Sequence, residues 1–240
     1  MEFALVLALG LLAGTVGGMV GFGTSIMLMP ALVLVFGPRE AVPIMAIAAI
    51  MANASRVAAW WREVDWRATA AYSATGIPAA ALGAKTLLVL PPGVVEAVLG
   101  VFFIAMIPVR RWMARQHWKL RLWHLALVGA AIGYLTGIVV STGPINAPFF
   151  LAYGLVKGAY LATEALGSLA VYLAKAVTFR SLGALPLDTI SKGLIVGSSL
   201  VAGAFIAKRF VLKIPAERFR LMMDGLLLVA GLTMLWAASR

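Results

Sequence analysis

The sequence predicts an all-α polytopic membrane protein, and three observations support this prediction. Hydrophobic residues make up 62% of the 240 residues and charged residues only 12%, and the mean hydropathy is +0.99. A soluble globular domain, by contrast, is roughly half apolar and about a quarter charged. Apolar runs of about twenty residues, the length that spans a hydrocarbon core, recur along the chain. No long polar segment remains between them, so we expect residues 1–240 to form a single transmembrane domain.

The apolar segments fall into two sets of five. In the first half they cover residues 3–20, 24–36, 41–60, 68–90 and 94–109, and in the second half 123–140, 144–156, 159–179, 189–211 and 220–237. Turns rich in glycine or proline, such as "GPREA", "PPG" and "IPAE", separate several of them. The second segment of each half reaches only about 20 Å, which is too short to cross the membrane. We therefore expect the first two segments of each half to form a discontinuous helix pair.

The two halves repeat the same features in the same order. Each carries a Gly-x3-Gly pair, a cluster of glycines and hydroxyls, a proline, a helix with one internal cation and a Gly/Ala-rich helix ending in lysine. The sequence thus predicts one repeat over residues 1–109 and a second over 123–240. Each half is predicted to cross the membrane an odd number of times, which makes the repeats inverted. Inverted repeats are a signature of secondary transporters, which bind substrate near the bilayer midplane where the repeats meet.

The basic residues indicate the orientation. Lys and Arg lie mostly in short segments between apolar runs, and the most basic segment is the linker 110–122. Because cytoplasmic loops carry an excess of Lys and Arg, we place this linker in the cytoplasm and both chain termini outside it. The net charge of +11 is explained by this pattern, so we expect no nucleic-acid partner.

Glycines, hydroxyls and a proline coincide where each helix pair breaks, in "GFGTS" and in "STGPIN". Irregular backbone at membrane depth is tolerated only where protein or a water-filled cavity satisfies it. Glycine lets backbone N–H groups converge on a ligand, and the helix that follows adds the positive end of its dipole. The sequence therefore predicts a midplane site for a small anion formed by Gly21, Gly23, Thr24, Ser25, Ser141, Thr142, Gly143 and Asn146. The alternative is close helix packing, which we favour for the pairs Gly14/Gly18 and Gly133/Gly137.

Three charged residues inside predicted spans are further candidates. Arg56 and Lys175 occupy matching helices, and Asn53 lies one turn before Arg56. A charge within a span usually faces the protein interior or a cavity, so we predict that Arg56 and Lys175, together with Asn53, contact the anion. The alternative for both cations is that they extend to the membrane interface. Glu164 is a candidate for carrying a coupling proton, or else a partner of Lys157 or of a cation on another helix.

The residues do not indicate catalysis. The chain has no cysteine, its two histidines (His117 and His124) lie in or beside the linker, and its acids are scattered singly. We therefore expect no enzyme, no metal site and no cofactor. An anion channel with the same site stays open as an alternative, whereas an intramembrane enzyme and a purely structural subunit are disfavoured.

Three longer motifs are "GTVGGMVGFGTSIMLMPAL", "VDWRATAAYSATGIPAAALGAK" and "GYLTGIVVSTGPINAPFFLAYGL". With these motifs the chain resembles the TauE/SafE family of membrane permeases, and the resemblance covers essentially the whole chain. It implies a multi-pass protein of the bacterial inner membrane that exports a small sulfur-containing anion such as sulfite or an organosulfonate. A proton or a sodium ion is the candidate coupling ion.

Overall fold

All regular secondary structure in the described residues is helical, as the sequence predicts. The computed structural model describes the chain except residues 1, 21–23, 114, 117–118, 140–141, 211–223, 226–227, 230, 233–234, 237 and 240. The helices are α1 (Glu2–Val20), α2 (Thr24–Phe36), α3 (Pro38–Trp60), η1 (Trp61–Glu63), α4 (Trp66–Val89), α5 (Pro92–Met113), α6 (Leu122–Ile138), α7 (Gly143–Tyr153), α8 (Lys157–Ser181) and α9 (Leu187–Phe210). Several residues between 224 and 238 are helical as well.

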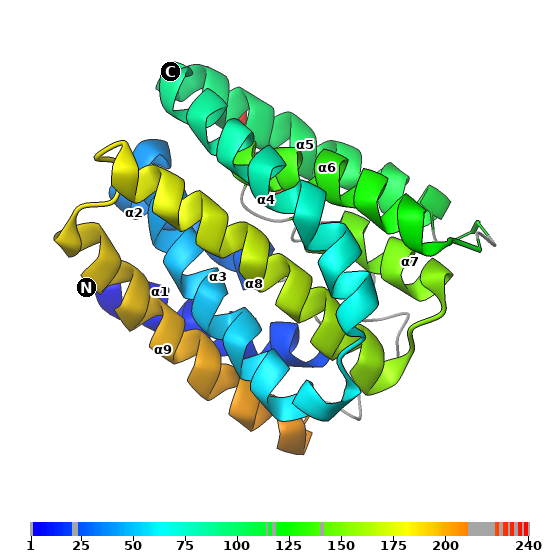
Figure 1. Cartoon of the computed structure of the whole chain (residues 1–240). Helices are drawn as coiled ribbons and strands as arrows, with labels where there is room; N and C mark the ends of the chain where they lie inside the picture. The colour runs from blue at the N-terminus through cyan, green and yellow to red at the C-terminus, as the bar shows by residue number, and fades with distance from the viewer. Residues whose placement is uncertain are drawn as a thin grey trace.

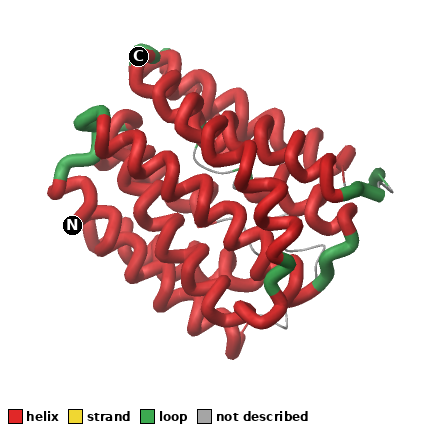
Figure 2. The backbone as a smooth tube through the Cα atoms, in the orientation of Figure 1, coloured by secondary structure: helices red, strands yellow, loops and turns green. Residues whose placement is uncertain are grey.

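The long helices lie side by side in one bundle with α3 and α8 at its centre (Figures 1 and 2). On one side α9 packs against α3 and α1 packs against α9, while on the other α4 packs against α8 and α6 against α4. The short helix α2 contacts α1 and α3, and the short helix α7 contacts α5, α6 and α8. The centre of the bundle is therefore built from both halves of the chain.

The two central helices run antiparallel. Arg56, near the end of α3, contacts Glu164, near the start of α8. The short helices α2 and α7 lie toward opposite ends of the bundle (Figure 1). The N- and C-termini lie at one end together with the loop between α8 and α9, and the loops that follow α3 and α5 lie at the other.

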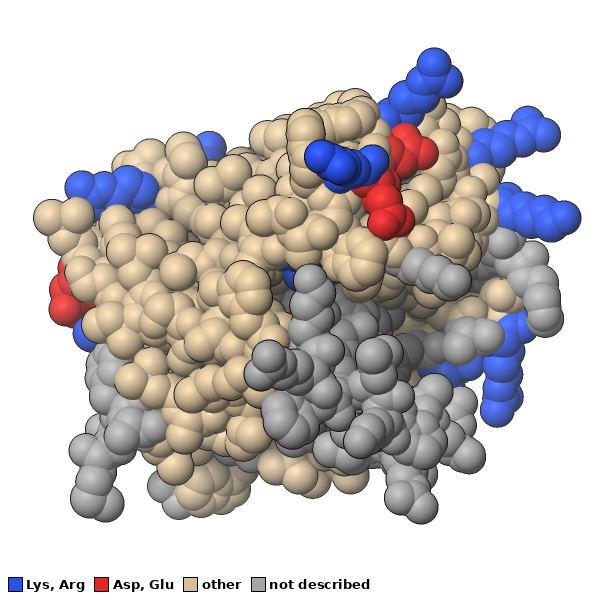
Figure 3. Space-filling model, turned by 90° about the horizontal axis from the view of Figure 1, so that it is seen from below, with Lys and Arg blue, Asp and Glu red and all other residues tan. Residues whose placement is uncertain are grey.

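The outer surface of the bundle suits a lipid environment. Among the described residues, three helical stretches are long and apolar enough to cross a membrane: Glu40–Glu63, Gly93–Met113 and Leu187–Ile206. Large apolar side chains are exposed on the outside, for example Val89 (80%) and Phe205 (70%). Figure 3 shows that most of the visible Lys and Arg side chains lie toward the two edges of this view, more of them on the right, with a largely uncharged surface between them. These findings indicate a helical membrane protein.

Glycines bring neighbouring helices into close contact. A Cβ atom at Gly137 of α6 would lie 2.5 Å from the carbonyl oxygen of Ala80 and 2.6 Å from the Cα of Gly83, both on α4. Gly133 meets Gly76 in the same interface, and Gly14 of α1 meets the backbone of Leu200 on α9. The packing interpretation therefore holds for Gly14, Gly133 and Gly137, whereas the surroundings of Gly18 are outside the described part.

Several helix ends differ from the predicted segments, and two of these differences have a clear physical cause. α5 continues to Met113, four residues into the predicted linker, because Met113 is buried and Arg111 forms an ion pair with Asp224. α7 ends at Tyr153 rather than 156, because Gly154 takes a φ of 108° and turns the chain out of the helix.

Candidate functional site

An ion pair joins the two central helices inside the bundle. Arg56 Nη1 lies 3.0 Å from Glu164 Oε2, and the exposed fractions of the two side chains are 12% and 2%. Asn53, one turn earlier on α3, donates from Nδ2 to the carbonyl oxygen of Ala49 (2.8 Å), which leaves its Oδ1 to accept from Arg56. The Arg56 side chain is thus held by its own helix and aimed at α8.

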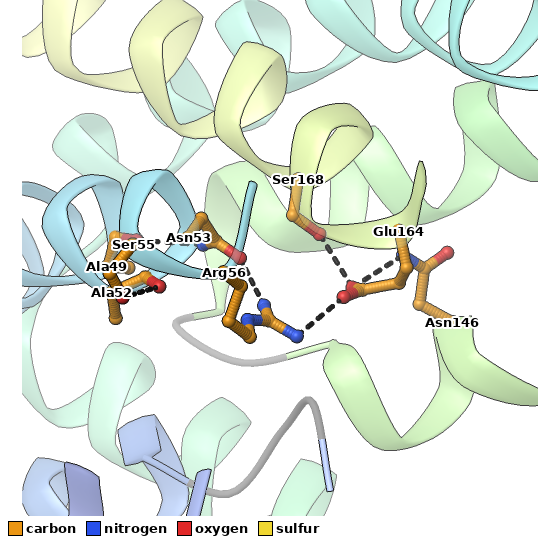
Figure 4. Close-up of polar contacts among 8 residues, drawn as sticks. All are labelled: Ala49, Ala52, Asn53, Ser55, Arg56, Asn146, Glu164 and Ser168. Atoms are coloured by element: carbon orange, nitrogen blue, oxygen red, sulfur yellow. Dashed lines mark hydrogen bonds and ion pairs between the residues drawn. The ribbon is translucent and has the colours of Figure 1, made fainter. Parts of the chain in front are cut away.

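The second carboxylate oxygen of Glu164 accepts hydrogen bonds from two neutral donors. Asn146 Nδ2, on α7, lies 3.2 Å from Oε1, and Ser168 Oγ, one turn further along α8, lies 2.7 Å from it. Figure 4 shows the three donors converging on this carboxylate from α3, α7 and α8. The carboxylate therefore has one cationic and two neutral hydrogen-bond donors in a largely buried place, an arrangement that suits an oxyanion.

The connection between α3 and α4 fixes α8 beside this site. Asp65 is the N-cap of α4, where its side chain accepts from the backbone N–H groups of Arg67 and Ala68. Its own backbone N–H donates to Thr163 Oγ1 at 2.9 Å, next to Glu164 in the chain. The cap thereby ties the start of α4 to the turn of α8 that carries the carboxylate.

Buried tyrosines surround the ion pair. Tyr72, Tyr160 and Tyr172 all lie close enough to Glu164 to interact with it electrostatically, and the Tyr172 side chain lies within reach of that of Ser25 on α2. Four buried polar atoms among the described residues have no hydrogen-bond partner: Thr69 Oγ1, Ser73 Oγ, Asn146 Oδ1 and Tyr160 Oη. They belong to α4, α7 and α8. Buried polar atoms are nearly always satisfied, so these atoms are available to a ligand or to bound water.

Lys175 forms a separate site on α8. Its side chain is 0% exposed, and Nζ donates to the carbonyl oxygens of Thr136 (2.7 Å) and Val139 (3.2 Å) at the end of α6. It lies eleven positions beyond Glu164, about 16 Å along the helix. Close by, the hydroxyls of Thr136 and Thr142 lie 2.5 Å apart across the break between α6 and α7.

The family model described as Sulfite exporter TauE/SafE matches residues 6–234, nearly the whole chain. The chain belongs to the sulfite exporter TauE/SafE family. No curated protein and no solved structure matches it. Membership confirms the resemblance and, together with the apolar helices, identifies the protein as a membrane transporter of the anion-exporter type and not an enzyme. Among the described residues no group of three or more His, Cys, Asp or Glu side chains forms a metal site.

The fold of this family member brings some of the predicted site residues together. Asn53, Arg56, Asn146 and Glu164 form one network, although they come from both halves of the chain. Lys175 and Thr142 lie together at the other site, with Gly143 beside them as the first residue of α7. Ser25 is buried at the start of α2 and Thr24 is half-buried beside it. Gly21, Gly23 and Ser141 lie outside the described residues.

The backbone at the start of α7 has fewer free N–H groups for an anion than the sequence predicts. Pro144 has no N–H, and the N–H groups of Ile145 and Asn146 donate to the carbonyl oxygen of Thr142 (3.0 and 2.8 Å). The Asn146 side chain, rather than its backbone, is what reaches the network.

Ser168 and the three tyrosines were not among the predicted site residues. A signal was present, because Tyr160, Glu164, Ser168 and Tyr172 recur at intervals of four, which places them on one face of a helix. A polar stripe of this kind in a predicted membrane helix indicates a face turned toward the protein interior.

Proposed function

We propose that this protein is a secondary transporter that exports a small sulfur-containing anion such as sulfite or an organosulfonate. The observation that carries the proposal is the donor set of Arg56, Asn146 and Ser168 on the Glu164 carboxylate. Sulfite and sulfonate groups likewise present several oxygens that share negative charge, and a guanidinium binds such groups with two parallel hydrogen bonds. A substrate oxyanion that takes the place of this carboxylate would receive the same donors.

Glu164 also gives the transporter a means of coupling to protons. While it is ionised, its carboxylate competes with the substrate for Arg56. Protonation removes that competition, so anion binding and proton uptake favour each other. The proton is therefore the coupling ion that this arrangement supports at the Arg56 site.

The helix breaks complete the proposed site. Ser25 approaches the network through Tyr172, while Thr142 and Gly143 begin α7, the helix that carries Asn146. Thr24 stays in the proposal as the residue beside Ser25, and Gly21, Gly23 and Ser141 stay in it as sequence predictions. The anion would then bind between the two broken-helix elements.

The helix contacts support two inverted repeats over residues 1–109 and 123–240. When the helices of the two repeats are matched in order, α1 corresponds to α6, α3 to α8 and α4 to α9. The contact of α1 with α9 then corresponds to that of α6 with α4, and the contact of α3 with α9 corresponds to that of α8 with α4. The pair α3 and α8 maps onto itself, and its antiparallel packing is what inversion requires. Rocking of the two repeats about the site between them would expose it alternately to each side.

Binding measurements on the purified protein test this proposal. Sulfite, sulfate and a small alkanesulfonate are titrated into wild type, Arg56→Ala and Arg62→Ala, the last being an exposed arginine six positions away. We expect saturable binding of sulfite or the sulfonate that Arg56→Ala weakens at least tenfold, equivalent to about 1.4 kcal/mol. Arg62→Ala should leave binding unchanged.

Two results would contradict the proposal. Binding that survives Arg56→Ala unchanged would move the anion site away from this network. An absence of binding by wild type to all three anions would refute the substrate class.

A further inference from the structure

The buried cation at Lys175 is held in an unusual way. No carboxylate of the described residues forms an ion pair with it, although its side chain is fully buried. The acid on the same helix, Glu164, is about three turns away and is bound by Arg56. A buried charge is costly unless other groups replace its hydration. At Lys175 that replacement comes from uncharged oxygens and from the ring of Phe179, whose centroid lies 5.5 Å from Nζ.

The oxygens belong to a helix end that attracts cations. Thr136 and Val139 are among the last residues of α6 and its C-cap. The last carbonyl groups of a helix have no partner within the helix and carry the negative end of its dipole. Nζ donates to both carbonyl oxygens, at 2.7 and 3.2 Å. The ammonium therefore lies where the break between α6 and α7 is most attractive to positive charge.

The chemistry of this oxygen set fits a monovalent cation. Two carbonyl oxygens accept hydrogen bonds from Nζ, and the hydroxyls of Thr136 and Thr142 contact each other across the same break. The two carbonyl ligands are neutral, as are the nearby hydroxyls, which suits a single positive charge rather than a divalent ion. In transporters with discontinuous helices, half-helix carbonyl ends of this kind coordinate sodium ions.

We propose that the Lys175 ammonium is a tethered cation that fills a carbonyl-lined cation site at the α6–α7 break. The side chain is covalently attached, so the site is occupied without a sodium ion from solution. Removal of the ammonium should expose the oxygens to a sodium ion. This inference concerns a site other than the Arg56 network, and its test requires no substrate.

The test measures thermal unfolding of the detergent-purified full chain without added substrate anion. Wild type, Lys175→Ala and Lys175→Met are each compared in sodium chloride and in choline chloride at equal ionic strength, so that general screening is constant. Lys175→Ala opens space beside the oxygens, whereas Lys175→Met removes the charge but keeps most of the volume. Lys192→Ala serves as a control, because Lys192 pairs with Glu40 and Asp188 away from the break.

We expect sodium to raise the unfolding temperature of Lys175→Ala by about 5 °C or more at saturating concentration. Wild type, Lys175→Met and Lys192→Ala should show no such difference. The proposal is overturned if Lys175→Ala is as stable as wild type in choline, or if it is destabilised equally in both salts.

A further comparison applies if Lys175→Ala cannot be purified in either salt. Lys175→Arg keeps a cation near the carbonyls, and Lys175→Met has no charge. The proposal requires Lys175→Arg to be the more stable of the two. Equal stability, or a more stable Lys175→Met, would show that the side chain serves only to fill volume.

Discussion

The two oxygens of the Glu164 carboxylate have different surroundings. One faces the Arg56 guanidinium, and among the described residues the other accepts hydrogen bonds from the neutral donors Asn146 and Ser168. Removing one partner of a buried ion pair commonly costs about 3–5 kcal/mol, because the other charge is left uncompensated. Protonation of Glu164 alone would leave the Arg56 charge uncompensated, and a bound anion would compensate it. Anion and proton should therefore bind together.

Glu164→Gln tests this coupling. Glutamine has the shape of the protonated acid, so Arg56 no longer meets a competing carboxylate. We expect the substitution to tighten sulfonate binding about tenfold near pH 7, the difference between a charge-assisted and a neutral hydrogen bond. Calorimetry in two buffers of different ionisation enthalpy should give uptake of about one proton per anion for wild type and none for the variant.

Ser168→Ala is the matched control, since it removes one donor and changes no charge. A variant Glu164→Gln that still takes up a proton with the anion would assign coupling to another group.

How far the sequence predicts this site can be judged from the same residues. Asn53, Arg56, Asn146 and Glu164 are identifiable because polar side chains in apolar segments are costly and are retained for a reason. The sequence does not reveal that these residues come together, because Arg56 and Glu164 are 108 positions apart and meet only through the packing of α3 on α8. The partners of Lys175 are backbone carbonyls, which no side-chain pattern reveals.

At the element scale, contact between α4 and α6 depends on the absence of side chains. Gly76 and Gly83 of α4 face Gly133 and Gly137 of α6 closely enough that backbone meets backbone. Helices in lipid gain little from the hydrophobic effect and associate through such close packing. The glycine pairs are therefore what holds α6, and the Lys175 site at its end, against the rest of the bundle.

Gly137→Ala should weaken this contact. The new methyl group would lie 2.5 Å from the carbonyl oxygen of Ala80, so the two helices must move apart. We expect a loss of about 1–3 kcal/mol, seen as a lower thermal unfolding temperature in detergent. Gly225→Ala is the control, because a Cβ there has nothing within 4 Å and alanine favours the helix. Equal effects of the two substitutions would refute the packing argument.

Helix boundaries show which local signals the sequence carries. Residues 24–36 were predicted as one short helix, and α2 spans these residues. The end of α7 was missed, because Leu155 and Val156 continue the apolar run after Gly154 has already turned the chain. Hydropathy reports burial, whereas the left-handed glycine decides where the hydrogen-bonded helix stops.

At the scale of the whole molecule, the bundle has two distinct ends. Both termini and the loop between α8 and α9 lie at one end, and the loops after α3 and α5 lie at the other (Figure 1). The second end carries the basic linker, and from the positive-inside rule we propose that this end faces the cytoplasm. The end with the termini would then lie outside the cytoplasm.

Single cysteines can test this orientation directly, since the natural chain contains none. Leu182→Cys and Ser239→Cys report on the end with the termini, and Arg62→Cys and Lys119→Cys on the linker end, all four being exposed positions. We expect a membrane-impermeant maleimide to label the first pair in intact cells and the second pair only after permeabilisation. If both pairs label with the opposite preference, the protein has the reverse orientation and the fold is unaffected. Different behaviour of Leu182→Cys and Ser239→Cys would refute the arrangement of inverted repeats, because the two positions would then lie on opposite sides of the membrane.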